Sequence, residues 1–270
     1  MADAVCRLSY SPDPLIESRQ YQSHLSFTLL APHGRDEGEV NRMIAMRAGN
    51  KRYKSIEDLP EIIPVFPLSG ALLLPGGNMP LNIFEPRYLA MTDHALKNDK
   101  LIGMIQPDLA SGEGEHGPKL YKTGCIGRLT GFQETGDGRY MINLSGICRF
   151  NVIEELPPHS EFRMVQMQAN ADDLINQEKL EADEKAINRK LLIDTFRRYL
   201  DANDMETDWS AVENTDDETL VTALCMMSPY GPAEKQALLE AADLKTRAET
   251  LVAITEMALA KGDNTQTHLQ

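Results

Sequence analysis

Between residues 62 and 165 the hydrophobic residues fall into short runs that are separated by turn-forming residues. Such runs are typical of β-strands, so this part of the chain is predicted to be mainly β. The clearest turn is Asp137-Gly138, a dipeptide that favours a tight hairpin. Because side chains alternate along a strand, we expect a core face and a solvated face after this turn, with a bend or bulge at Gly146. The core face holds Tyr140, Ile142, Leu144, Cys148, Phe150 and Val152, and the solvated face holds Arg139, Asn143, Ser145, Arg149 and Asn151.

Two segments of the β region carry a different pattern. The run IIPVFPL contains Pro64 and Pro67, and because proline cannot donate to a β ladder, this strand is predicted to lie at a sheet edge or beside a bulge. In EPRYLAMTDHALKN the apolar residues have helical spacing and Pro86 suits a first helical turn, which predicts one short helix. The polar, glycine-rich stretch 107–118 is predicted to be a mobile loop.

The pattern becomes helical and acidic after Asn170, which predicts a second subdomain of roughly four helices. Thr215 and Glu218 fit a capping box at the start of one of these helices. The first part of the chain shows neither a helical nor an alternating period, so we expect a disordered leader, part of which could be an over-extended reading frame. The predicted divisions are a leader at 1–54, a β domain at 55–168, a helical subdomain at 169–262 and a frayed tail at 263–270.

Charge and cysteine content narrow the classes of partner. The net charge of -14 in 270 residues should repel nucleic acid and anionic membranes, which are held largely by Lys and Arg. No apolar stretch approaches the roughly 20 residues that cross a bilayer, so a membrane protein is not expected. The four cysteines, Cys6, Cys125, Cys148 and Cys225, are far apart and fit a reducing cytosol better than a zinc or redox motif.

The segment 62–88 reads IIPVFPLSGALLLPGGNMPLNIFEPRY. It resembles the opening of the substrate-binding domain at the N-terminus of the ATP-dependent Lon proteases. The residues that carry the resemblance are Pro67, Leu68, Pro75, Pro80, Phe84, Glu85, Pro86, Arg87 and Tyr88. The strands at 124–127 and 146–150 resemble two later signatures, so the resemblance covers most of 62–259. It implies an α+β fold, in which a PUA-like β pseudobarrel is followed by a C-terminal α-helical bundle.

The resemblance also implies a binding task, since in that family this domain takes part in recognising unfolded or tagged polypeptides and in assembly. We find neither a G-x-x-x-x-G-K-[ST] phosphate loop nor a Ser-Lys peptidase domain, so we expect no ATP hydrolysis, no proteolysis and no cofactor. The expected function is a cytoplasmic, non-enzymatic polypeptide-binding module that acts as an adaptor or quality-control factor. The alternative is a PUA-like RNA-binding or RNA-modifying protein, which would need a basic groove.

Apolar residues around the Pro75 turn are the candidates for a peptide-binding surface. They are Leu72, Leu73, Leu74 and Met79. Exposed apolar patches often mark interaction sites, but packing in the core would produce the same pattern and is the favoured alternative.

Other chemically distinctive residues have ordinary structural explanations. Glu85 and Arg87 could hold a peptide terminus, but a carboxylate at a helix start also complements the helix dipole, and that role is favoured. Cys125 and Cys148 are predicted on neighbouring strands, with Cys148 roughly opposite Gly127, where two small buried side chains are favoured over a redox pair. His94 and His116 lack enough nearby ligands, so no metal site is expected.

Overall fold

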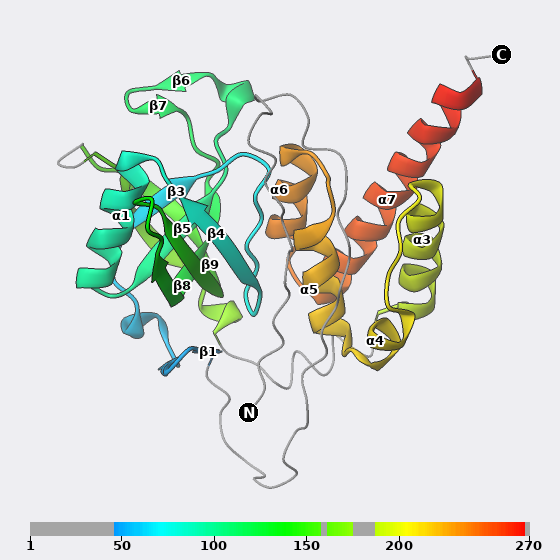
Figure 1. Ribbon diagram of the computed structural model, residues 1–270, viewed down its shortest axis with the longest axis horizontal. Helices are drawn as coiled ribbons and strands as arrows, with labels where there is room; N and C mark the ends of the chain where they lie inside the picture. Colours follow the sequence, from blue (N-terminus) through cyan, green and yellow to red (C-terminus); the bar gives the residue numbers. More distant parts are fainter. Residues whose placement is uncertain (1–45, 158–160, 175–186, 268–270) are drawn as a thin grey trace, which may run out of the picture.

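The computed structural model describes residues 46–157, 161–174 and 187–267, with side chains up to residue 261 (Figure 1). The strands are β1 Met46–Ala48, β2 Lys51–Tyr53, β3 Ile62–Pro67, β4 Asn78–Ile83, β5 Leu101–Ile105, β6 Glu113–Gly114, β7 Gly117–Pro118, β8 Thr123–Glu134, β9 Tyr140–Glu155 and β10 Met164–Ala169. The α-helices are α1 Pro86–Lys97, α3 Arg189–Ala202, α4 Trp209–Asn214, α5 Asp217–Met227, α6 Pro232–Glu240 and α7 Leu244–Thr267, and short 3-10 turns are η1 Ile56–Asp58, η2 Leu109–Ser111 and η3 Ala171–Asp173. This order confirms the predicted α+β class.

The six-stranded sheet closes on itself to form a barrel. Its strand order is β10-β3-β5-β8-β9-β4, and β10 also pairs with β9. The long strand β9 makes this closure possible, because its first half, 140–145, pairs with β4 and its second half, 150–155, pairs with β10. Its other edge pairs with β8 along the whole predicted hairpin.

A bulge at Ile147 separates the two halves of β9. Ile126 of β8 faces Cys148 while Gly127 faces Gly146, so Ile147 is an extra residue in the ladder. Before the bulge the even-numbered residues pack toward α1 and the helices, and after it they point into the barrel. The odd-numbered Arg149 therefore faces the helical subdomain and is buried, so its predicted place on a solvated face is wrong.

The barrel interior is filled by Phe150, which occupies space that two glycines leave open. A Cβ atom added to Gly124 would lie 2.6 Å from the Phe150 ring, and one added to Gly103 would lie 2.9 Å from it. The β1–β2 hairpin closes one end of the barrel, where buried Tyr53 accepts a hydrogen bond from the Arg128 guanidinium at 3.0 Å. The predicted leader therefore ends too late, since residues 46–54 belong to the fold; residues 1–45 lie outside the described part.

Strand β3 is an inner strand, so the first of its two predicted positions, a sheet edge, is wrong, whereas its partner β10 does carry a register shift, between Gln166 and Met167. It pairs with β10 through residues 62–64 and with β5 through residues 65–67. The Val65 N–H donates to Arg163 on the β10 side and the Leu68 N–H donates to Ile105 on the β5 side. Because these directions alternate along the strand, Pro64 faces β5 and Pro67 faces β10. Pro64 is not paired with β5 and Pro67 is not paired with β10, so neither missing N–H group removes a hydrogen bond from the sheet.

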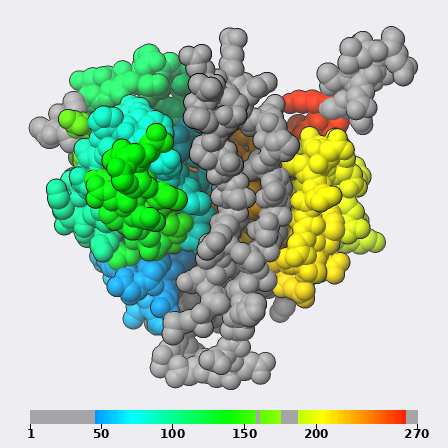
Figure 2. Space-filling view, viewed as in Figure 1, coloured from blue at the N-terminus to red at the C-terminus, as the bar shows by residue number. Residues whose placement is uncertain are grey.

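The helical subdomain shares a hydrophobic core with the outer face of the barrel. Helices α5 and α6 lie between the barrel and the α3–α7 pair, and one buried cluster runs from Leu144 of β9 to Leu224 of α5 and Leu251 of α7 (Figure 1). In the space-filling view the barrel with α1, in blue to green, lies on one side of the molecule, and α3 and α4, in yellow, lie on the other (Figure 2).

Several local expectations change in detail. The described helical residues form five helices rather than four, and the N-cap of α5 is Asp216, whose carboxylate accepts the Thr219 N–H, rather than Thr215. Helix α7 continues to Thr267, beyond the predicted start of the tail, and the 107–118 stretch contains η2 and the small β6–β7 hairpin. Among the described helices, none is both long and apolar enough to span a bilayer.

Candidate functional site

The Pro75 turn is packed into the protein rather than exposed. Leu72, Leu73 and Leu74 are buried, and Met79 is half-buried. The Gly76 N–H donates to the carbonyl of Gly146 in the β9 bulge at 3.1 Å, which holds the turn against the sheet. The expectation that these leucines are exposed is therefore wrong, and their burial agrees with the alternative of core packing.

Four of the nine residues that carry the family resemblance build the start of α1: Glu85, Pro86, Arg87 and Tyr88. Pro86 occupies the first turn, and Glu85 is the N-cap residue, although its side chain makes no capping hydrogen bond. Glu85 instead pairs with Arg87 at 2.8 Å on the exposed surface. The buried ring of Tyr88 packs on Phe66 with centroids 4.2 Å apart, and its hydroxyl donates to the Pro67 carbonyl at 3.5 Å. These contacts are structural.

Phe84 differs from Tyr88, the other aromatic residue of the signature, because 61% of its surface is exposed. It follows β4 on the face of the sheet that also carries Met141, which is 54% exposed and lies directly opposite Asn82. The Arg139 guanidinium stands 5.9 Å from the centre of the Phe84 ring. We call Phe84 and Met141 the apolar patch.

Polar side chains cover the same sheet face next to the apolar patch. Ser145 of β9 donates to the side-chain oxygen of Asn78 on β4 at 2.6 Å, and its hydroxyl lies 2.9 Å from that of Thr130 on β8. Asn143 donates to Thr130 at 2.9 Å. The face is therefore a ladder of amides and hydroxyls across three strands that ends at two exposed apolar side chains.

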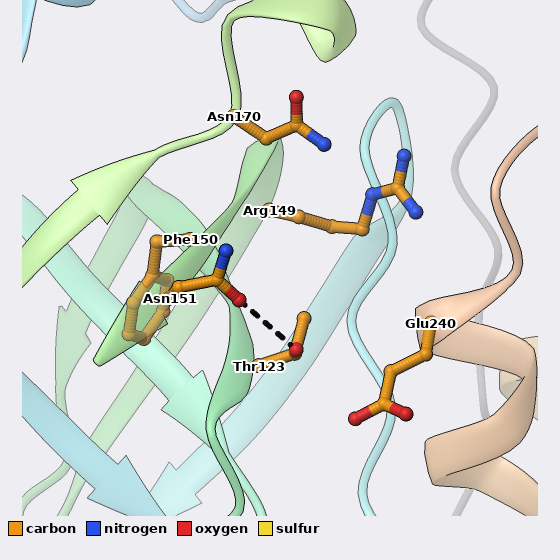
Figure 3. Close-up of a pocket in the computed structure, with 6 residues that line it drawn as sticks. All are labelled: Thr123, Arg149, Phe150, Asn151, Asn170 and Glu240. Atoms are coloured by element: carbon orange, nitrogen blue, oxygen red, sulfur yellow. Dashed lines mark hydrogen bonds between the residues drawn. The ribbon is translucent and has the colours of Figure 1, made fainter. Parts of the chain in front are cut away.

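A second feature is a small pocket at the joint between the barrel and α6 (Figure 3). It is lined by Thr123, Arg149, Phe150, Asn151, Asn170 and Glu240, and its volume is about 190 Å³. This is below the roughly 300 Å³ at which small-molecule sites begin. Thr123 donates to Asn151 at 3.2 Å and Glu240 accepts from Gln236 at 2.7 Å, so these polar groups already have partners.

Arg149 is likewise committed to the structure of this joint. Its guanidinium forms a two-bond ion pair with Asp173, at 2.9 and 2.7 Å. It also donates to the backbone carbonyls of Leu239 in the last turn of α6 and of Ala241 and Ala242 in the α6–α7 turn. All five of its N–H groups are thus used, and none remains for a ligand.

The cysteines and histidines of the described residues form no reactive constellation. Cys125 faces Arg149 and Cys148 faces Ile126, so the two thiols lie on opposite faces of the sheet. This register differs by one residue from the predicted pairing of Cys148 with Gly127, because of the bulge. Burial raises the pKa of Cys125 well above its usual value and that of Cys148 to about 12. The described residues contain no group of three potential metal ligands.

Comparisons with known proteins agree with the resemblance seen in the sequence. The family model of the ATP-dependent protease La (LON) substrate-binding domain matches residues 62–256. Lon protease 2 of Myxococcus xanthus is 27% identical over 71% of this chain and 23% of its own length. The Lon protease of Parabacteroides distasonis is 28% identical over 74% of this chain and 24% of its own length. The chain therefore spans less than a quarter of these two relatives.

A solved structure shares the fold. It is the N-terminal domain of a Mycobacterium avium complex Lon protease, which matches with a TM-score of 0.51 and 17% identity over 72% of this chain and 98% of that domain. At this identity the match supports the architecture alone. The family match over residues 62–256 shows that the chain belongs to the Lon substrate-binding domain family.

Proposed function

We propose that this protein binds unfolded or tagged polypeptide and that the apolar patch is the contact surface. Membership of a substrate-binding domain family gives the class of task. The observation that supports this location is the exposure of both Phe84, directly after β4, and Met141, opposite Asn82 of β4, where a client could cover them. Of the apolar candidates around the Pro75 turn, Leu72, Leu73 and Leu74 are buried, and Met79 of β4 is half-buried.

The apolar patch alone would bind weakly. Burying two side chains of this size contributes about 3 kcal/mol, and association itself costs several kcal/mol. Because a Kd of 1 mM already requires about 4 kcal/mol, binding would be weaker than millimolar if nothing else contributed. Weak, reversible contact suits a module that samples many clients, and a tighter complex needs backbone hydrogen bonds in addition.

The proposed role is non-enzymatic, that of a cytoplasmic adaptor or quality-control factor. Among the described residues the buried thiols have raised pKa values, and no cluster of metal ligands is present, so neither suggests an assembled reaction centre. The protease activity of the full-length Lon relatives is not carried over, because the chain matches only a quarter of them or less.

The charges around the apolar patch favour polypeptide over RNA. Arg139 pairs with Asp137 at 3.1 Å and Arg87 pairs with Glu85 at 2.8 Å, so the cations beside Phe84 are balanced by carboxylates. An RNA-binding surface needs a stripe of basic side chains that are free to reach phosphates. The apolar patch provides uncharged area instead.

A titration with an unfolded protein tests the proposal. Fluorescently labelled, reduced and carboxymethylated α-lactalbumin should bind the wild type, and Phe84→Asp or Met141→Asp should weaken binding by about tenfold, since a charge obstructs apolar docking. Ile153→Asp and Met257→Asp are matched controls, because these residues are 60% and 54% exposed but lie elsewhere. Thermal melts followed by circular dichroism confirm folding. Unchanged affinity in folded Phe84→Asp and Met141→Asp variants would disprove this location.

A further inference from the structure

Strand β4 has one edge that no described residue pairs with. Its six residues pair with β9 along one side, and β4 stands at the end of the sheet order. The direction of its backbone groups is fixed at its start, where the Gly146 N–H donates to the Gly77 carbonyl at 2.8 Å. Because backbone groups alternate in direction, residues 77, 79, 81 and 83 face β9, and residues 78, 80 and 82 face outward.

The outward row offers a nearly complete set of ladder groups. Asn78 and Asn82 each present an N–H and a C=O, and Pro80 presents a C=O only. The side chains of all three residues are exposed. Pro80 thus lies where its missing N–H disturbs no bond to β9, and it lowers the number of free donors on the edge.

We infer that an extended segment of the bound polypeptide adds to this edge as a seventh strand; this inference rests on the proposed function. Side chains of the added strand that lie beside Asn82 would share the sheet face of the apolar patch. Alternate client side chains would then reach Phe84, while the client backbone bonds to Asn78, Pro80 and Asn82. Backbone hydrogen bonds supply affinity that does not depend on the client sequence. A protein that binds many different unfolded chains needs such affinity.

A second copy of this chain is the less suitable occupant of the edge. In the antiparallel register that sets Asn78 against Asn82 of the other copy, Pro80 would face Pro80. Neither proline can donate, so the centre of that pairing would lack hydrogen bonds. A client segment with ordinary residues can donate to the Pro80 carbonyl and loses only one bond.

Three substitutions on the edge test strand addition. Asn82→Pro removes an outward N–H and leaves β9 pairing intact, and Asn82→Ala removes only the side chain. Pro80→Ala adds the missing donor. With labelled, reduced and carboxymethylated α-lactalbumin as the probe, we expect Asn82→Pro to weaken binding by about fivefold, Pro80→Ala to strengthen it by about as much, and Asn82→Ala to leave it within about twofold of the wild type.

The other outcomes separate this inference from the function on which it rests. If folded Asn82→Pro and Pro80→Ala bind like the wild type while Phe84→Asp weakens binding, strand addition is wrong and the apolar patch stands. If the wild type does not bind the probe at all, both ideas fail. If the wild type self-associates in sedimentation experiments and Asn82→Pro abolishes that association, the edge pairs with a second copy, and the inference is overturned.

Discussion

Arg149 shows how one extra residue in a strand changes the role of a charged side chain. Without the Ile147 bulge, alternation would place Arg149 on the solvated face of β9. With it, the guanidinium points to the α6–α7 turn and pairs with Asp173, and about 10% of each side chain in this pair is exposed. Such a pair is costly to break, because removing one partner leaves the other charge buried.

The buried thiols make stability depend on pH in the alkaline range. Burial raises the pKa of Cys148 and Cys225 from 9.0 to about 12. In the unfolded chain both return to their ordinary value, so between pH 9 and 12 the native state binds more protons than the unfolded state. The free energy of unfolding is expected to fall as pH rises through this window, by up to about 1.4 kcal/mol per pH unit for each thiol.

Urea titrations at pH 8, 9 and 10 measure this slope. Other groups titrate in the same range, so the double variant Cys148→Ala, Cys225→Ala is the control. It should show a smaller fall in unfolding free energy between pH 9 and 10 than the wild type, whatever its stability at pH 8. Equal slopes in the two proteins would show that the thiols do not contribute.

At the scale of elements, local signals in the sequence predict local structure well. The helix at 86–97 and the hairpin at Asp137-Gly138 are confirmed, since Pro86 occupies the first helical turn and Gly138 adopts φ 80° in the turn between β8 and β9. The edge position of β3 is wrong because prolines exclude only a particular hydrogen bond. In β3 one neighbour pairs with residues 62–64 and the other with residues 65–67. An inner strand of this kind can contain two prolines without losing a hydrogen bond to either neighbour.

The β1–β2 hairpin was missed because it is too short to show a period. Each strand has three residues, and only Ala48 and Tyr53 of the hairpin are buried. A single aromatic residue in a polar segment gives no alternation to detect. Its importance comes from contacts distant in sequence, above all the hydrogen bond from Arg128 to the Tyr53 hydroxyl.

Truncations should therefore separate the hairpin from the residues before it. A chain that starts at residue 55 loses the Tyr53 side chain from the barrel end, as does Tyr53→Ala, and each change should cost about 3 to 5 kcal/mol, or about 10 °C in Tm. A chain that starts at residue 46 should melt within about 2 °C of the full chain. These melts can be followed by circular dichroism, and a stable chain starting at residue 55 would show that the hairpin is dispensable.

At the scale of the whole molecule, the candidate site could not be read from the sequence. Leu73 and Phe84 are both apolar residues of one signature segment, yet Leu73 is 1% exposed and Phe84 is 61% exposed. What separates them is the docking of the Pro75 turn on the β9 bulge, a contact between segments about 70 residues apart. Tertiary contacts between segments so far apart in the sequence decide which of these side chains is exposed. The family and the α+β class, in contrast, follow from local motifs and their order.

The shared core predicts that the barrel and the helical subdomain unfold together. The buried cluster that includes Leu144 and Leu224 crosses the joint, and Gln106 of the barrel donates to the Pro232 carbonyl of α6 at 2.9 Å. Trp209, the one tryptophan of the chain, reports on the helical subdomain by fluorescence, and alkylation of Cys148 reports on the barrel interior. Both probes should give the same urea midpoint, as expected for one cooperative unit.

Substitution at the joint makes this prediction stricter. Arg149→Met should lower the unfolding free energy by about 3 kcal/mol and shift the Trp209 and Cys148 transitions by the same amount, because the lost pair stabilises both parts. Arg198→Met is the matched control, since its ion pair with Glu256 is exposed and should be worth less than about 1 kcal/mol. If Arg149→Met moves the Trp209 transition and leaves that of Cys148 in place, the helical subdomain unfolds independently, and the shared core does not couple the two parts.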